Sequence, residues 1–134
     1  MLQIGDTYSE VFSYTQDQVI SFAELSGDKN PLHLDVEYAA TTMFKKPIIH
    51  GILGASILSK ILGMYFPGEG TIYLKQEIDF KRPMYVETKY EAQLTVLEIN
   101  KDRHTAIIET KIVDKETGKV NVLGNAHIMH KEKI

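Results

Sequence analysis

The hydrophobic pattern of this chain changes from a helical to a strand period near residue 70. Between Gly51 and Tyr65, apolar side chains surround most of the circumference of a helix, and such a helix is expected to be buried. After Pro67–Gly70, apolar and polar residues alternate through long segments, which is typical of half-buried antiparallel strands. One apolar helix followed by such strands predicts an α+β fold in which a large curved sheet wraps the helix.

Capping residues and turns predict the remaining elements. Thr15 and Gln18 have the spacing of a capping box, so we expect a short helix that ends at Gly27. Asp35 can cap a second short helix, which would run from residue 36 to about Phe44. We expect a short strand over 7–14 and then a four-stranded meander over the segments 72–80, 86–96, 106–112 and 120–128, with Gly118 in a left-handed turn.

Length and composition restrict the classes of protein that remain. The 134 residues fit one domain, spanning 1–134, and the absence of cysteine excludes disulfides, thiol nucleophiles and Cys-based metal sites. The net charge of −3 comes without a basic block, which argues against nucleic-acid binding. No basic start precedes an apolar run as in a signal peptide, and the apolar stretch 48–66 is interrupted by polar residues. We therefore expect a cytoplasmic protein without a membrane partner.

The segment Ser26–His33 carries the first candidate chemistry. It places the carboxylate of Asp28 five residues before the imidazole of His33. Pro31 fixes its own φ and pushes Asn30 out of the helical region, so we expect a kinked loop that is neither regular helix nor strand. Such a loop can aim an acid/base pair at one point, as proton transfer on a small molecule requires. The alternative is that Asp28 braces the loop and His33 is a surface residue.

A second candidate group lies in Pro47–Gly51, directly before the apolar helix. The first N–H groups of a helix are unpaired and carry the positive end of its dipole, so they can stabilise an anionic oxygen. Gly51 would let a ligand approach this backbone closely. The alternative is that Gly51 serves tight packing while His50 bonds to nearby backbone, and both interpretations can hold together.

The remaining serine and histidine residues are weaker candidates for a functional site. Ser56 and Ser59 share one face of the apolar helix; Ser56 is expected to bond a carbonyl one turn earlier, and Ser59 is either bonded in the same way or functional. His104, His127 and His130 show no metal-ligand spacing, and we interpret them as surface residues. No nucleophile elbow, phosphate loop or HExxH motif is present. We expect no metal site.

Several of these segments together resemble a known family. The run Phe22–Asp35, followed by Ala39 and Ala40, is similar to the hydratase-2 signature of MaoC-like dehydratases, also called (R)-specific enoyl-CoA hydratases. The resemblance continues through the segments Pro47–Gly51, Gly68–Leu74 and Phe80–Pro83, so it covers nearly the whole chain.

The resemblance implies a fold and a set of site residues. The family has the hot dog fold, a long helix wrapped by an antiparallel sheet, and its members are usually homodimers, or higher homo-oligomers, with joined edge strands and an acyl chain that enters between subunits. By resemblance Asp28 and His33 are the catalytic pair and the N–H of Gly51 holds the thioester oxygen. Asn30 would orient the loop, and Ser59 would lie near the catalytic aspartate.

The activity implied is reversible hydration of trans-2-enoyl-CoA to (3R)-hydroxyacyl-CoA, with no cofactor beyond the thioester substrate. Three alternatives use the same fold: a dehydratase acting on acyl-carrier-protein thioesters, a thioesterase, and a non-catalytic acyl-CoA-binding subunit. A thioesterase usually carries its carboxylate on the long helix, which here has no acidic residue. Lys81 and Arg82, near a strand end, are candidates for the CoA phosphates, although an exposed charged pair is more often only solvated. Val86–Thr88 stands where the family often has Val-Gly-Asp, which puts the local turn in doubt.

Overall fold

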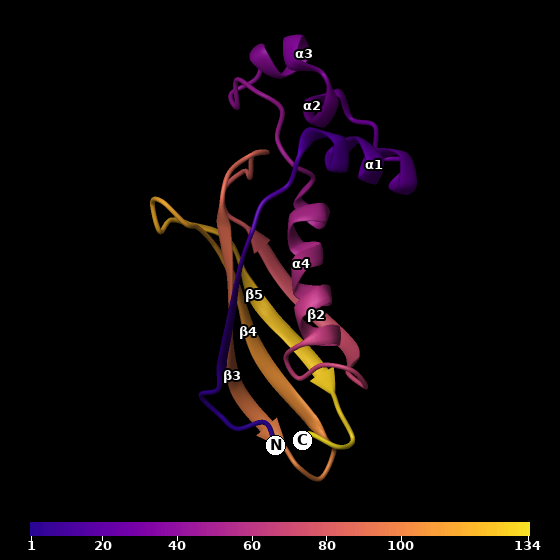
Figure 1. Cartoon of the computed structure of the whole chain (residues 1–134), viewed down its shortest axis with the longest axis vertical. Helices are drawn as coiled ribbons and strands as arrows, with labels where there is room; N and C mark the ends of the chain where they lie inside the picture. Colours follow the sequence, from indigo (N-terminus) through magenta and orange to yellow (C-terminus); the bar gives the residue numbers. More distant parts are fainter.

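The computed structural model describes residues 1–134 and contains one five-stranded antiparallel sheet that curves around a long helix, α4 (Figure 1). The buried side of α4 presents aliphatic residues such as Ile57, Leu58 and Ile61 to the inward side chains of the strands. The predicted α+β fold is confirmed. The elements are β1 (Thr7–Phe12), α1 (Gln16–Ser26), α2 (Pro31–Leu34), α3 (Val36–Ala40), α4 (Gly51–Met64), β2 (Ile72–Phe80), β3 (Tyr90–Asn100), β4 (Thr105–Asp114) and β5 (Val120–Met129).

The strand order is β1-β3-β4-β5-β2, so only β3, β4 and β5 form a meander. The prediction of a four-stranded meander is wrong, because β2 lies beside β5 at one edge of the sheet instead of beside β3. Residues 81–89 make the long connection from β2 to β3, and Lys81 and Arg82 donate their backbone N–H groups to the Asn121 carbonyl on β5. Alternating polarity reports which face a side chain takes and not which strand lies next to it.

One side of α4 remains uncovered. Ile52 and Met64 are 63% and 65% exposed, and Ser59 is exposed as well. The prediction that this helix is buried on all sides is therefore wrong for the single chain. The neighbouring edge strand β2 also exposes apolar side chains, including Ile72 and Leu74. No helix of the chain combines the length and the apolar character that crossing a membrane would need.

The helices before α4 begin where capping residues place them. Thr15 and Gln18 form the predicted capping box, and α1 ends at Gly27, whose φ of 81° lies in the left-handed region. Asp35 accepts backbone hydrogen bonds at the start of α3, as predicted, but α3 ends at Ala40 and not near Phe44.

The short helix α2 was not expected. Asn30 caps it by accepting a hydrogen bond from the Leu32 N–H, and Pro31 occupies its first position, where the missing N–H costs nothing and the fixed φ suits a helix. The expectation that Ser26–His33 contains no regular helix is therefore wrong for its last residues. His33 projects from a helical turn, while Asp28 stays in the loop before it.

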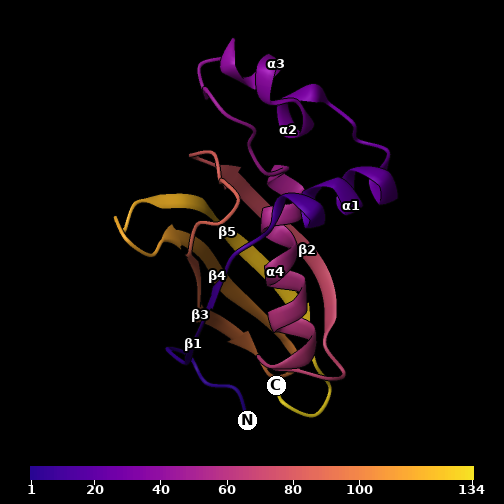
Figure 2. The ribbon, with the colours of Figure 1, turned by 45° about the horizontal axis from the view of Figure 1, so that its top comes forward.

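The two ends of the sheet differ in what lies beyond them. Helices α1, α2 and α3 extend past one end, next to the first turn of α4, and both chain termini lie at the opposite end (Figure 2). The loop that carries Asp28 is thus held at the tip of α4 and away from the main body of the sheet.

The histidines of the second half occupy three different environments. His104 is exposed, in agreement with the prediction, and its Nδ1 lies 2.7 Å from the Ile134 carbonyl oxygen. His130 is only 3% exposed, so its interpretation as a surface residue is wrong. Its Nε2 donates to the Glu69 carbonyl oxygen at 2.8 Å, because backbone N–H groups after β5 occupy its Nδ1.

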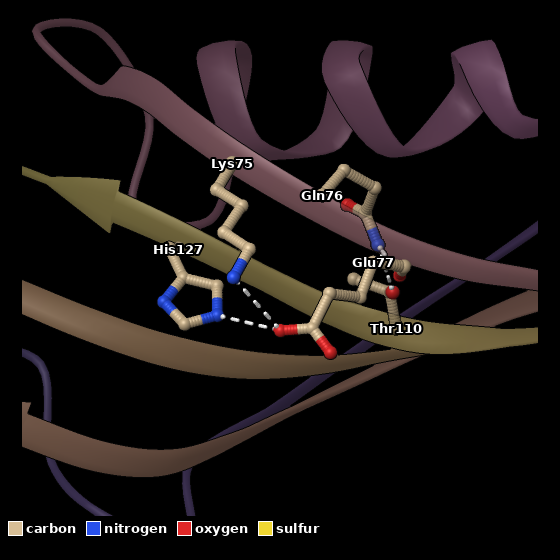
Figure 3. A network of polar contacts seen from close by, with 5 residues as sticks. All are labelled: Lys75, Gln76, Glu77, Thr110 and His127. Carbon is tan, nitrogen blue, oxygen red and sulfur yellow. Dashed lines mark hydrogen bonds and ion pairs between the residues drawn. The ribbon is translucent and has the colours of Figure 1, made fainter.

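The third histidine, His127, is half-buried and joins a polar network on β2 and its neighbours (Figure 3). Lys75 and His127 both contact one carboxylate oxygen of Glu77, at 3.4 and 3.3 Å. The hydrogen bonds from Lys75 and His127 lower the pKa of the Glu77 carboxyl. The side-chain amide of Gln76 donates to Oγ1 of buried Thr110 at 2.9 Å, so polar contacts tie the edge strand to the sheet.

The turn at Val86–Thr88 lies where the sequence departs from the Val-Gly-Asp pattern of the family that it resembles. Glu87 has a φ of 55°, in the left-handed region that favours glycine, while its N–H still donates to the Tyr14 carbonyl oxygen at 2.9 Å. The turn therefore forms without the family's glycine, at a cost in backbone strain.

We expect Glu87→Gly to raise the free energy of unfolding by roughly 0.5–1 kcal/mol. A left-handed backbone costs a residue with a Cβ about 1–2 kcal/mol, and the larger unfolded-state freedom of glycine cancels part of the gain. Urea unfolding measures the difference. Glu116→Gly, at a turn residue whose own φ is not positive, is the matched control and should lower stability by a similar amount. A loss of stability in both variants would contradict the assignment of strain to Glu87.

Candidate active site

The loop before α2 and the residue before α4 bring three titratable side chains together. A carboxylate oxygen of Asp28, a ring nitrogen of His33 and a ring nitrogen of His50 all lie within 4.8 Å of one another. The predicted pairing of Asp28 with His33 is therefore present in the structure. The third member, His50, ends the segment that leads into α4.

His33 is oriented by its Nδ1, which lies 2.8 Å from the carbonyl oxygen of Ile48. A carbonyl oxygen only accepts, so Nδ1 carries the hydrogen, and in the neutral imidazole Nε2 carries the lone pair. The side chain is 8% exposed, and Nε2 makes no hydrogen bond within the chain. A group in this state can accept a proton from a water molecule.

Asp28 is exposed, and its conformation is held by hydrogen bonds to residues two positions away in the sequence. Its Oδ1 accepts a hydrogen bond from the Asn30 N–H at 3.2 Å, and its own N–H donates to Ser26 Oγ at 3.1 Å. The other carboxylate oxygen accepts no hydrogen bond from the chain. Asn30 thus acts on the aspartate through its backbone, while its side chain caps α2.

The first turn of α4 provides free donors next to this pair. The first backbone bond into the helix runs from the Gly54 N–H to the His50 carbonyl oxygen, so the N–H groups of Gly51, Ile52 and Leu53 have no partner within the chain. No side chain caps this end. Unpaired N–H groups at a helix N-terminus are well placed to hold a developing negative charge.

Gly51 is also required by packing. A Cβ added there would lie 2.8 Å from Cε1 of Phe80, closer than carbon atoms normally approach. The packing interpretation is confirmed, because the Phe80 ring lies against the Gly51 Cα. The same residue presents a free N–H, and its role in holding a ligand oxygen stays a prediction.

A cavity of about 500 Å³ lies next to Gly51. Its lining is mostly apolar and comes from the segment before α4, the end of β2 and the following connection: Met43, Phe44, Ile48, Ile49, Gly51, Ile52, Phe80, Lys81, Arg82, Pro83, Met84 and Val122. Asp28 and His33 are outside this lining, but Ile48 belongs to it and also holds His33 through its carbonyl. Cavity and acid/base pair are thus neighbours joined by the backbone of residues 48–51.

Lys81 and Arg82 line this cavity, and their selection as candidate phosphate ligands stays a prediction. Both residues are exposed. The Arg82 guanidinium donates to the Val120 carbonyl oxygen at 2.8 Å, which leaves most of its donors free.

Known proteins match this chain in sequence and in fold over almost its entire length. Residues 4–120 match the MaoC-like domain. The chain belongs to the MaoC-like domain family. An (R)-specific enoyl-CoA hydratase of Aeromonas caviae is 44% identical over 93% of this chain and 92% of its own length. A solved structure of an (R)-hydratase from A. caviae involved in PHA biosynthesis superposes with a TM-score of 0.92 at 39% identity, over 96% of this chain and 97% of that one.

A mitochondrial 3-hydroxyacyl-[acyl-carrier-protein] dehydratase of Solanum lycopersicum is 31% identical over 96% of this MaoC-like chain and 78% of its own length. The hot dog fold implied by the sequence resemblance is therefore confirmed, by family membership and by the structural match.

Not every candidate residue of the MaoC-like chain reaches the site. Ser59 lies two turns along α4 from Gly51, is exposed, and makes no hydrogen bond with Asp28 within the chain. Ser56 donates to the Leu53 carbonyl oxygen at 2.6 Å, which is the predicted backbone contact.

His50 was not selected as a site residue from the sequence. The signal that could have found it is a lone histidine in an apolar segment, directly beside the glycine chosen for its N–H. It is 2% exposed and stacks on His33 with ring centroids 3.9 Å apart at 27°.

This stacking bears on metal binding. Metal ligands point their in-plane lone pairs at one ion about 2.0–2.1 Å away. Two rings stacked face to face direct their lone pairs side by side, so His33 and His50 are poorly arranged to share an ion. The geometry favours proton transfer at this cluster.

Proposed function

We propose that this chain catalyses the reversible, (R)-specific hydration of trans-2-enoyl-CoA to (3R)-hydroxyacyl-CoA. The observation that carries the proposal is the juxtaposition of the Asp28 carboxylate, the free Nε2 of His33 and the unpaired N–H of Gly51 at one end of α4. The 44% identity to an (R)-specific enoyl-CoA hydratase supports the substrate class. The enzyme would be a hydro-lyase.

The chemistry divides among these groups. A water molecule held between Asp28 and His33 loses a proton to the pair as its oxygen bonds to C3 of the enoyl group. The electrons of the C2–C3 double bond move toward the thioester oxygen, where the Gly51 N–H and the helix dipole stabilise the enolate charge. The enolate then collapses as C2 takes a proton back from the pair. Addition from one face gives the syn product.

Each of these catalytic groups contributes a typical factor to the rate. A positioned acid/base group contributes on the order of 10²–10⁴ in rate, and one oxyanion donor contributes about 10²–10³. Only water and the thioester are consumed, so we propose that the reaction needs no cofactor. The acyl thioester would enter the cavity beside Gly51, with Lys81 and Arg82 placed at its edge for the CoA phosphates.

The test is hydration of enoyl-CoA thioesters of increasing chain length, followed by the loss of conjugated enoyl absorbance, with chiral analysis of the product. We expect turnover and a (3R)-hydroxyacyl product. Release of free thiol would instead indicate a thioesterase, and tight binding without turnover would indicate an acyl-CoA-binding subunit.

A dehydratase acting on acyl-carrier-protein thioesters is the second candidate. It is favoured by the 31% identity to the mitochondrial dehydratase of Solanum lycopersicum, and it would use the same groups in reverse. Comparing kcat/KM on CoA and carrier-protein thioesters of one acyl chain separates the two. A large preference for the carrier-protein thioester would favour the dehydratase.

We propose that two copies of the chain join through β2. This nine-residue strand is a free edge, and its Ile72 and Leu74 are 52% and 51% exposed, next to the uncovered side of α4. An exposed apolar edge strand is prone to pair with another chain unless it is protected. The other edge, β1, is shorter, with six residues.

The prediction is that Ile72→Lys combined with Leu74→Lys converts a dimer into a monomer, because charges oppose burial of the edge. Sedimentation velocity measures the change. Val11→Lys places a charge on the opposite edge strand β1, at a side chain that is also exposed, and should leave the dimer intact. A wild-type monomer, or a dimer lost only in the Val11 variant, would contradict the proposed edge.

A further inference from the structure

His50 has contacts that the proposed reaction does not itself require. Its ring is 2% exposed, stacks on His33 at 3.9 Å, and meets the ring of Phe22 edge-on at 4.9 Å. Its Nε2 lies 2.9 Å from the carbonyl oxygen of Asp28. The same side chain therefore touches the main chain of one member of the catalytic pair and the ring of the other.

The hydrogen-bond pattern determines the tautomer of His50. The Asp28 carbonyl oxygen can only accept, so Nε2 carries the hydrogen and Nδ1 carries the lone pair. This Nδ1 is buried and has no partner. Buried polar atoms are nearly always paired, so an unpaired one calls for a specific reason. An aromatic ring without nitrogen would fill the same space without leaving an unpaired atom. The donor at Nε2 is the property that such a ring would lack.

The loop that carries Asp28 has few other ties to the protein. The remaining hydrogen bonds of residues 27–30 are local. The Gly27 N–H donates to Ala23, the Asp28 N–H to Ser26, the Lys29 N–H to Gly27 and the Asn30 N–H to Asp28, while Asn30 accepts from the N–H groups of Leu32 and His33. The bond from His50 is the only one that joins these four residues to a distant part of the chain. Without it, the position of the Asp28 carboxylate relative to His33 would depend on an exposed loop alone.

We propose that His50 is a positioning residue for the Asp28–His33 pair. Its Nε2–H fixes the backbone of Asp28, and its ring face fixes the plane of His33, so that both groups address one water molecule. This proposal rests on the proposed function, because it concerns the geometry of the same pair.

Two substitutions separate the donor from the ring. His50→Phe keeps an aromatic face and loses the donor, whereas His50→Gln keeps a side-chain N–H at the reach of Nε2 and loses the ring. We expect kcat to fall by about 10² in His50→Phe, as for a small misplacement of reacting groups, with KM nearly unchanged. His50→Gln should recover part of the kcat that His50→Phe loses.

His130 provides the matched control. It is 3% exposed and its Nε2 donates to a backbone carbonyl in another loop. It directly follows β5, in the segment that leads to the C-terminus, and this terminus lies at the end of the molecule opposite to helices α1–α3 (Figure 2). His130→Phe should lower the melting temperature and leave kcat per folded enzyme unchanged. The proposal is overturned if both His50 variants keep wild-type kcat, or if kcat falls equally in His130→Phe and His50→Phe.

A spectroscopic readout keeps this test independent of catalysis. In ¹⁵N-histidine-labelled protein, long-range ¹H–¹⁵N spectra should report His50 as the Nε2–H tautomer. An Nδ1–H tautomer would overturn the contact with Asp28. If the wild type does not hydrate enoyl-CoA, the proposed function fails, and the tautomer still decides whether His50 holds the loop.

Discussion

Asp28→Asn is expected to lower kcat for enoyl-CoA hydration by roughly 10²–10⁴ without unfolding the protein. Asparagine keeps the Oδ1 atom that accepts the Asn30 N–H at 3.2 Å, so the loop keeps its shape. It lacks the negative charge that lets the carboxylate share the proton of the bound water. Initial rates with crotonyl-CoA measure the loss, and circular dichroism with thermal unfolding reports the fold.

His33→Asn should give a loss of similar size. The asparagine amide nitrogen can replace Nδ1 as donor to the Ile48 carbonyl, whereas no atom replaces the free Nε2. Residues that act as one unit are strongly non-additive, so the double variant should be little slower than either single variant.

Asp35→Asn provides the matched control for both variants. Asp35 also accepts backbone hydrogen bonds through its side chain, at the start of α3, and asparagine caps a helix about as well as aspartate. This variant should keep wild-type kcat. A folded Asp28→Asn, His33→Asn double variant with near-normal turnover would exclude the pair as the water-activating group.

These expectations began as sequence predictions, and the structure shows which ones local pattern can support. The curved sheet around one helix follows from the change of period near residue 70. The spacing of apolar residues along a short segment determines which face of a helix or strand is buried. The capping box at Thr15 and the left-handed Gly118, with φ of 75°, are also local and were predicted correctly. The partner of β2 was missed because pairing depends on distant residues.

The candidate site divides in the same way. The spacing of Asp28 and His33, together with the family signature, was sufficient to select the pair. His50 contacts the pair through a ring stack with His33, 17 positions away in the sequence, and a hydrogen bond to the Asp28 backbone, 22 positions away. Neither contact produces a periodic pattern in the sequence. The helical spacing left Ser59 either bonded to the backbone or functional, and the family resemblance selected it as a site residue. Within one chain it remains on the uncovered side of α4. A partner copy joined through β2 is the proposed element that would cover this side.

Gly51→Pro tests the oxyanion donor, which ordinary side-chain substitution cannot reach. Proline is well tolerated at the first position of a helix, where it removes one N–H that has no intrahelical partner. His50, with ψ of 131°, already has the extended conformation that a residue before proline prefers. The substitution should therefore remove the donor and leave α4 in place.

Gly51→Ala separates this effect from the packing of Phe80. Both variants add a Cβ that would lie 2.8 Å from the Phe80 ring, whose exposed side chain can shift, but only proline removes the N–H. We expect Gly51→Pro to be slower than Gly51→Ala by about 10²–10³ in kcat, as for the loss of one oxyanion donor. Equal kcat values in two folded variants would show that the Gly51 N–H does not hold the enolate charge, and the donor would then have to be sought at Ile52, the next free N–H of the same helical turn.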